Sequence, residues 1–370
     1  MWYKDANPET HSRDTRSCAP ILNAAMKTRW ASNPIHGPSY EETTECRGIT
    51  VKVNASVPAR INIIGEHTDH FGGLSLTFSS QHRLELTAST REDGSRGNQT
   101  VINLWEASGG WSADLDVDSN IPIGAGLSSS AAPCVAIVMC SQNNIDPMEI
   151  SLEAQRIENQ VLRSNCGLMD QISITHSKEG IATLLDFSRM SIEGFRMPDD
   201  WRFKLVDTGI RRSLSETNYS SSEIKNGTRR KHAKEESARV RAALSSDARA
   251  LGTILNESHA SISDNIRAST PEIDKMVKEI QNTAGVLGAR LMGGGFGGMI
   301  LALSKKKTCF RGASGFFRLC LPSGNSLAFS VVQVSPCPRT EYRLSALQSI
   351  RTWRGKLLLP TPCSVSPEII

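Results

Sequence analysis

The segment IPIGAGLSSSAA, residues 121–132, is the strongest of three segments in this sequence that carry candidate chemistry. Gly124 and Gly126 carry no side chain, so the backbone N–H groups of the loop can approach an anion. Three serines follow at the start of an apolar run that predicts a helix, and a helix N-terminus is positive and rich in free N–H groups. The segment therefore predicts a phosphate site, and a turn that only caps a helix is the alternative. It is not a GxxxxGK[ST] loop, because no lysine follows the glycines.

The segment PARINIIGEHTDHFGG, residues 58–73, places an arginine, two carboxylates and two imidazoles where a predicted strand ends. Such groups suit hydrogen bonds to several hydroxyls of a polyol. A metal site at His67, Asp69 and His70 is an alternative, although no fixed ligand spacing supports it. A polar surface loop is a second alternative.

The segment GARLMGGGFGG, residues 288–298, has five glycines in six positions, which excludes a helix interior. It predicts a turn between two short strands whose backbone lies directly against a ligand or against another loop. Taken alone, a tight hairpin without a ligand explains it as well.

Together and in this order, the three segments resemble the signatures of the GHMP sugar and metabolite kinases, and among them the galactokinases. The family's sugar signature, close to GRVNLIGEHTDYNGG, is matched by ARINIIGEHTDHFGG, and its P-x-G-x-G-L-S-S-S-A loop is matched from Pro122 to Ala131. NCGLMDQ, residues 165–171, is similar to the galactokinase segment with the catalytic aspartate. DTGIRRSLSETNY, residues 207–219, is similar to the strand and loop that bring a tyrosine to the sugar.

The resemblance implies an α+β, two-domain GHMP kinase fold: a ribosomal-S5-like N-terminal domain and a ferredoxin-like C-terminal domain, incomplete at its C-terminus. The expected parts are an irregular arm (1–48), the N-terminal domain (49–200), the C-terminal domain (201–304) and an atypical tail (305–370). The implied activity is transfer of the γ-phosphoryl group of ATP, with Mg²⁺, to the C1 hydroxyl of α-D-galactose. The alternatives are a catalytically inactive regulator that binds sugar and ATP, and a truncated product that does not fold stably.

The resemblance also implies residue roles. Asp170 stands at the anomeric hydroxyl as base or orienting acceptor, and Arg60 lies beside it, where a cation keeps the carboxylate ionised. The implied sugar-binding residues are Glu66, His67, Asp69 and Tyr219. The implied phosphate-binding residues are Gly124, Ala125, Gly126, Leu127, Ser128, Ser129 and Ser130. The implied Mg²⁺ ligands are Ser130 and Glu158, and a solvated helix position is the alternative for Glu158.

Four features depart from the family pattern. Ala59 replaces a glycine before the arginine, and Pro133 falls early in the predicted helix, where we expect it to distort the first turn. Only 48 residues separate Gly73 from Pro122, fewer than in galactokinases, whose additional residues contribute to the adenine pocket and to a supporting helix. SSSEIKNG after Tyr219 has the character of an insertion.

Periodicity and turn residues predict the remaining elements. We expect strands at 49–57, 59–65, 181–187 and 203–209, and a hairpin of LELTAST (84–90) with VINLWEA (101–107). We expect helices at 131–139, 147–164, 228–244, 248–258 and 270–283, the last capped by Thr270.

The composition excludes several classes. The chain has 42 Lys and Arg against 38 Asp and Glu, but the tail from Lys305 onward holds ten of the basic and only two of the acidic residues. A basic excess confined to one end argues against a surface built for nucleic acid, and the basic helix at 228–241 is better explained as a solvated face. No apolar run is long enough to predict a membrane span or a signal peptide. Nine cysteines without a CxxC pair indicate cytosolic thiols. We therefore expect a cytoplasmic monomer whose partners are galactose and ATP, with no nucleic acid and no membrane.

After Leu303 no strand or helix period persists. The tail is either a basic binding segment or a stretch that does not belong to the design of this fold, for example from a shifted reading frame.

Overall fold

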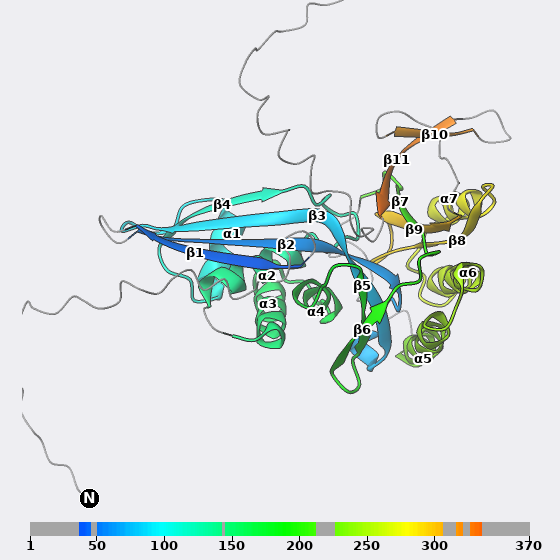
Figure 1. Ribbon diagram of the computed structural model, residues 1–370, viewed down its shortest axis with the longest axis horizontal. Helices are drawn as coiled ribbons and strands as arrows, with labels where there is room; N and C mark the ends of the chain where they lie inside the picture. Colours follow the sequence, from blue (N-terminus) through cyan, green and yellow to red (C-terminus); the bar gives the residue numbers. More distant parts are fainter. Residues whose placement is uncertain are drawn as a thin grey trace, which may run out of the picture. The chain divides into compact units, whose positions relative to one another are not determined.

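A computed structural model of the protein describes residues 37–45, 50–142, 145–211, 226–305, 316–320 and 326–334. These residues form two antiparallel sheets with helices packed against them, which confirms the α+β class (Figure 1). None of the described helices combines the length and the apolar composition that a membrane crossing requires.

The first sheet has the strand order β1-β2-β3-β5-β6, and β4 pairs with the second half of β3. Its strands are β1 (Ser39–Glu45), β2 (Thr50–Ile64), β3 (Leu74–Thr90), β4 (Ala113–Ser119), β5 (Ile181–Asp186) and β6 (Ser191–Arg196). The two strands expected between residues 49 and 65 are one strand, whose pairing register with β3 shifts between Pro58 and Arg60. The irregular arm expected at 1–48 is wrong for Ser39–Glu45, which pairs with β2.

Four helices cover this sheet, and two of them lie directly on β2 and β3. They are α1 (Gln99–Ala107), α2 (Ala131–Ser141), α3 (Pro147–Leu162) and α4 (Met169–Thr175). The helix α2 runs without a break through Pro133, whose missing N–H falls in the first turn, where no intrahelical partner is needed. The expected distortion is therefore absent. The helix α3 begins at Asp146 with a complete capping box that includes Glu149.

The expected hairpin of residues 84–90 with 101–107 is wrong, because VINLWEA lies within the helix α1. The Asn98 side chain accepts a hydrogen bond from Thr100 N at 2.9 Å and caps this helix. Leu104 and Trp105 are fully buried on its inner face. The short interval between Gly73 and Pro122 thus contains the helix α1.

The second sheet has the order β10-β11-β7-β9-β8. Its strands are β7 (Phe203–Asp207), β8 (Val286–Leu291), β9 (Met299–Ser304), β10 (Phe316–Cys320) and β11 (Ser326–Val334). The helices α6 (Ala248–Asp264) and α7 (Pro271–Gln281) pack on its strand β8, and α5 (Asn226–Ala243) packs against α6 and against β3 of the first sheet. The ranges of α5 and α7 are close to the predicted ones, and α6 continues six residues beyond its predicted end. Thr270 caps α7 as predicted, since its hydroxyl accepts a hydrogen bond from Ile273 N at 3.4 Å.

The expectation that no strand follows Leu303 is wrong for two segments of the tail. The backbone of β11 pairs antiparallel with β7, and β10 pairs with β11. The proposed boundary of the atypical tail at 305 stays a prediction.

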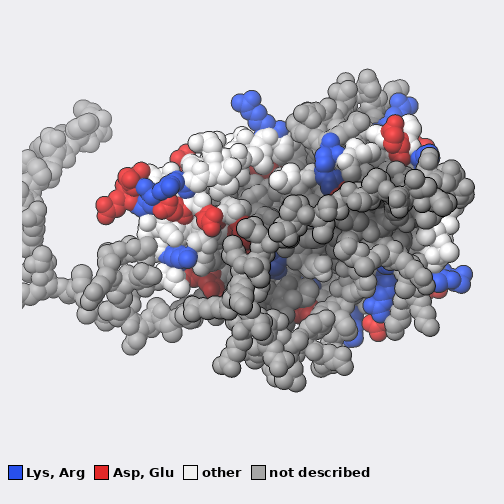
Figure 2. Space-filling view, turned by 90° about the horizontal axis from the view of Figure 1, so that it is seen from above, with Lys and Arg blue, Asp and Glu red and all other residues white. Residues whose placement is uncertain are grey.

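One apolar core runs through both sheets and places their loops together. The rings of Phe78 on β3 and Phe203 on β7 lie 5.6 Å apart between centroids. The basic helix expected at 228–241 is part of α5, which buries one face including His232, Glu236 and Val240. On the described part of the face in Figure 2, basic and acidic side chains are interspersed and form no continuous basic field.

Candidate active site

Arg60, in the segment PARINIIGEHTDHFGG, contacts both the glycine–serine loop and the segment NCGLMDQ. It lies on β2, is 3% exposed, and pairs through Nη2 with the carboxylate of Asp170 in the first turn of α4. Its Nη1 donates to the carbonyl of Gly126 in the glycine–serine loop at 2.8 Å. Burial acts to lower the pKa of this guanidinium, but the carboxylates of Asp170 and Glu66 outweigh it and hold that pKa above its ordinary value. The Asp170 side chain stays 28% exposed, so a ligand can reach its carboxylate.

The glycine–serine loop has left-handed backbone at three positions. Gly124, Gly126 and Ser128 have φ angles of 67°, 73° and 62°. The loop leads directly into α2, whose N-terminus offers free N–H groups. The Ser128 hydroxyl is buried and has no hydrogen-bond partner among the described residues. A buried polar group without a partner is costly, so this hydroxyl fits a site completed by a ligand.

The third segment packs against this loop. Met299 N donates to the carbonyl of Ala125 at 3.0 Å. A Cβ atom added to Gly298 would lie 2.7 Å from the same carbonyl, and one added to Gly126 would lie 2.9 Å from Met292 O. Of the two roles that the glycines allowed, the structure shows contact with another loop. The third segment thus packs directly against the glycine–serine loop.

Glu158 lies on α3, close enough to Asp170 for the two charges to interact, and is 2% exposed. Gln171 Nε2 donates to its Oε2 at 2.7 Å, and the Ser130 hydroxyl is also hydrogen-bonded to this carboxylate. Burial raises the pKa of Glu158 to about 7; the hydrogen bond from Ser130 acts in the opposite direction, and the charge of Asp170 adds to the rise. A hydroxyl and a buried carboxylate beside a phosphate loop are hard oxygen donors, so these two residues fit Mg²⁺.

The sugar loop, residues 65–74, lies against both Asp170 and the third segment. Glu66 is 1% exposed, and its Oε1 accepts a hydrogen bond from Gly293 N at 2.7 Å. Burial lowers the pKa of His67 to about 3 and His232 adds to this, so the imidazole is neutral.

Asp69, one of the predicted sugar-binding residues, lies beside the residues that precede α4. A Cβ atom added to Gly167, just before α4, would clash with the Asp69 carboxylate. Burial raises the pKa of Asp69; His70 acts against the rise and Asp170 adds to it, and the net pKa lies above its ordinary value. In the described part of the chain, no three His, Cys, Asp or Glu side chains are arranged to hold a metal ion, so nothing supports the alternative metal site in this loop.

The structure thus brings Arg60 into contact with Asp170 and with the glycine–serine loop, which is the predicted phosphate loop. Glu158 contacts Gln171, the residue after Asp170, and the sugar loop contacts the third segment. Tyr219 lies outside the described residues. Sequence reasoning missed Arg290, the one charged residue of GARLMGGGFGG. It also missed Arg211, which forms a two-point ion pair with Asp207 at 2.5 and 2.7 Å. The Arg211 Cδ lies 3.3 Å from the place of a Cβ on Gly124, which sets a cation beside the phosphate loop.

Comparison with known proteins identifies the family. Residues 45–89 match the galactokinase galactose-binding signature, residues 98–178 match the GHMP kinases N terminal domain, and residues 240–308 match the GHMP kinases C terminal domain. The chain is 32% identical over 316 residues to the galactokinase of Thermotoga maritima, covering 69% of this chain and 90% of that relative. The chain belongs to the galactokinase family of GHMP kinases. The galactokinase of Thermotoga petrophila is also 32% identical, over 318 residues, with the same coverage.

Solved structures of this superfamily share the fold. Lactococcus lactis galactokinase complexed with galactose has a TM-score of 0.60 at 25% identity, covering 68% of this chain and 86% of that one. Methanococcus jannaschii mevalonate kinase has a TM-score of 0.59 at 15% identity, covering 76% and 98%. This chain therefore has the two-domain GHMP kinase fold, and it belongs to the sugar kinases of that superfamily.

The chain is shorter than its relatives within the matched region. The alignment to the Thermotoga maritima protein spans 316 positions but includes only 69% of the 370 residues of this chain, which is fewer residues than positions. The relative therefore has residues in this region that this chain lacks. This agrees with the short interval between Gly73 and Pro122.

Proposed function

We propose that this galactokinase-family chain transfers the γ-phosphoryl group of ATP to the C1 hydroxyl of α-D-galactose, giving galactose 1-phosphate and ADP. The observation that supports the proposal is the contact of Arg60 with both Asp170 and Gly126, because a partly exposed carboxylate beside the glycine–serine loop is the arrangement that this reaction needs. Phosphoryl transfer needs mainly positioning and charge neutralisation, which such a junction supplies.

In the proposed reaction, the galactose O1 atom forms the new bond to the γ-phosphorus and the bond from that phosphorus to the bridging oxygen of ADP breaks. The Asp170 carboxylate accepts the proton of the C1 hydroxyl, or holds that hydroxyl in line as the proton leaves to solvent. Arg60 keeps Asp170 ionised and stabilises charge on the transferred group.

The surrounding residues bind the two substrates. Backbone N–H groups from Gly124 to Ser130 cradle the phosphates of ATP. Ser130 and Glu158 would hold Mg²⁺, which supplies neutralisation of phosphate charge when bound. In the sugar loop, His67 offers a neutral imidazole and Asp69 a carboxylate to sugar hydroxyls, Glu66 offers its second oxygen, and Tyr219 completes the pocket.

The test is an ADP-release assay on the full chain with galactose and Mg-ATP, with galactosamine and arabinose as competing acceptors. We expect turnover that depends on galactose and disappears in Asp170→Ala. Folded protein that binds galactose and ATP saturably but releases no ADP would overturn the proposal and favour a regulator that only binds.

The proposal includes a monomer that acts in the cytoplasm on galactose and ATP, without nucleic-acid or membrane partners. Light scattering coupled to gel filtration measures the oligomeric state, and a dimer would contradict this part of it.

A further inference from the structure

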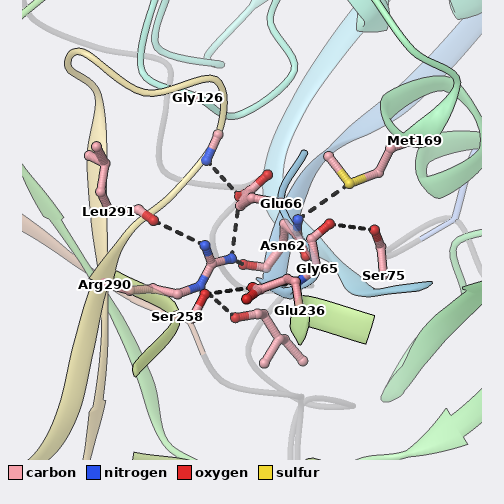
Figure 3. A network of polar contacts seen from close by, with 12 residues as sticks. Asn62, Gly65, Glu66, Ser75, Gly126, Met169, Glu236, Ser258, Arg290 and Leu291 are labelled. Carbon is pink, nitrogen blue, oxygen red and sulfur yellow. Dashed lines mark hydrogen bonds and ion pairs between the residues drawn. The ribbon is translucent and has the colours of Figure 1, made fainter. Parts of the chain in front are cut away.

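The helix α5 lies outside all three sequence segments and yet holds the sugar loop. Its residue Glu236 is fully buried, and its Oε1 accepts a hydrogen bond from Gly65 N at 3.2 Å, at the start of the loop. The same oxygen accepts from the hydroxyl of Ser258 on α6 at 2.5 Å (Figure 3). Oε2 accepts from Arg239 Nη1 at 2.8 Å. The carboxylate is thus satisfied from three sides.

Other residues of α5 contact further points of the loop. The Ser237 hydroxyl accepts a hydrogen bond from Leu74 N at 3.0 Å, at the far end of the loop. The carbonyl of Glu66 lies 3.1 Å from His232 Nε2 and can only accept, so Nε2 carries the proton and Nδ1 accepts from Ser261 at 2.8 Å. Both ends of the loop are therefore fixed to one helix.

The Gly65 backbone explains why an acceptor is needed there. Its φ of 104° is a conformation that side chains disfavour, and a Cβ atom would lie 2.4 Å from the carbonyl of Leu74. A buried N–H in this strained turn has no helix or strand partner, and leaving it unpaired is costly. A carboxylate suits the position because its oxygens accept from Gly65, Ser258 and Arg239 without presenting a donor.

We propose that Glu236 is a positioning residue for galactose: it fixes the sugar loop through Gly65 N, so that Glu66, His67 and Asp69 face the sugar. The inference rests on the proposed function, since it assigns galactose to this loop. Glu236 touches neither substrate and acts through the loop backbone.

The experiment compares Glu236→Ala and Glu236→Gln with Glu235→Ala. The control removes the same charge from the same helix. Glu235 is partly exposed and forms a surface ion pair with Lys231. Steady-state kinetics give kcat and the KM values for galactose and ATP. Hydrogen–deuterium exchange of the loop peptide is measured without substrates.

We expect Glu236→Ala to raise the KM for galactose about tenfold or more, with the KM for ATP changed by less than about twofold. Amide exchange should accelerate in residues 65–74 and not in the phosphate loop. Glu236→Gln should recover part of the loss, because its carbonyl still accepts from Gly65 while its NH₂ faces Arg239, another donor. If Glu236→Ala does not fold, the glutamine variant decides.

Loop exchange and a galactose KM equal to those of Glu235→Ala would overturn the inference. Parallel rises of both KM values, or a fall in kcat alone, would also overturn it, since they indicate a general structural role. Absence of turnover in the parent protein would reject the proposed function, whereas the exchange data would still decide whether Glu236 holds the loop.

Discussion

Nη2 of Arg290 on β8 lies 3.3 Å from Oε1 of Glu66 in the sugar loop, and both side chains are shielded from solvent. The same guanidinium donates from Nε to the carbonyl of Ile63 at 2.8 Å and from Nη2 to that of Asn62 at 2.7 Å (Figure 3). One side chain of the second sheet thereby binds the end of β2 and the start of the loop that follows it.

We expect Arg290→Met to lower the free energy of unfolding by about 3–5 kcal/mol, because it leaves the buried Glu66 without its cation. Arg290→Lys keeps the charge but loses the fork of donors, so it should also destabilise. Urea denaturation followed by tryptophan fluorescence measures both. The matched control is Arg249→Lys at an exposed position of α6, which should leave the midpoint unchanged. Equal midpoints for Arg290→Lys and Arg249→Lys would contradict the bridging role.

Asp170→Asn should lower kcat by roughly 10²–10⁴-fold, since the amide cannot accept the hydroxyl proton. Galactose and ATP should still bind, because Asp170 is partly exposed and the loops keep their own contacts. Stopped assays of ADP give kcat, and isothermal titration gives the two affinities. Asp114→Asn removes a carboxylate from the exposed end of β4 and should behave as the parent does. A kcat for Asp170→Asn within a factor of ten of the parent would exclude proton acceptance by this carboxyl.

Glu158 predicts an unusual dependence of stability on pH in the absence of metal and nucleotide. Its pKa is raised from 4.5 to about 7 in the folded protein, so the folded state holds this proton more tightly than the unfolded chain does. Folding is therefore coupled to proton uptake between these values, and stability falls as pH rises from about 4.5 to 7, by up to roughly 3 kcal/mol.

Glu158→Gln removes this titration, so the difference in unfolding free energy between variant and parent should grow from pH 5 to pH 8. Chemical denaturation at closely spaced pH values measures it. Excess Mg²⁺ with nucleotide should reduce the difference, because a bound cation favours the ionised carboxylate. A difference that is constant across this range would show that Glu158 titrates normally.

The sequence predicted those elements whose signals are local. Helical spacing and good helix formers predicted α3, and Thr270 with Pro271 predicted the start of α7. The capping box of Asp146 and Glu149 at the start of α3 is equally local but did not enter the prediction. VINLWEA, in contrast, has the β-branched and aromatic residues of a strand, and the cap at Asn98 and burial of its inner face make it helical.

Contacts between distant segments explain what the sequence did not reveal about the site. The three quoted segments contact one another in the structure, which their positions in the sequence do not show. Glu236 lies 171 positions from Gly65 in the chain, and no periodic pattern predicts that a residue on a polar helix accepts that N–H. The strand β11, SLAFSVVQV, has the β-branched and aromatic residues typical of a strand, but it was not among the predicted strands. Its pairing with β7 shows that it is part of the second sheet.

Gly298→Ala should weaken ATP binding, because a methyl group there would lie 2.7 Å from the carbonyl of Ala125 and push on the phosphate loop. The matched control is Gly94→Ala: its φ of 87° is close to the 91° of Gly298, but nothing lies within 4 Å of its Cβ position. Both variants incur about 1 kcal/mol for the left-handed backbone, so the difference between them isolates the clash. We expect a KM for ATP raised about tenfold or more in Gly298→Ala only, with a larger loss of thermal stability. Equal effects of the two substitutions on both quantities would show that the third segment does not support the phosphate loop.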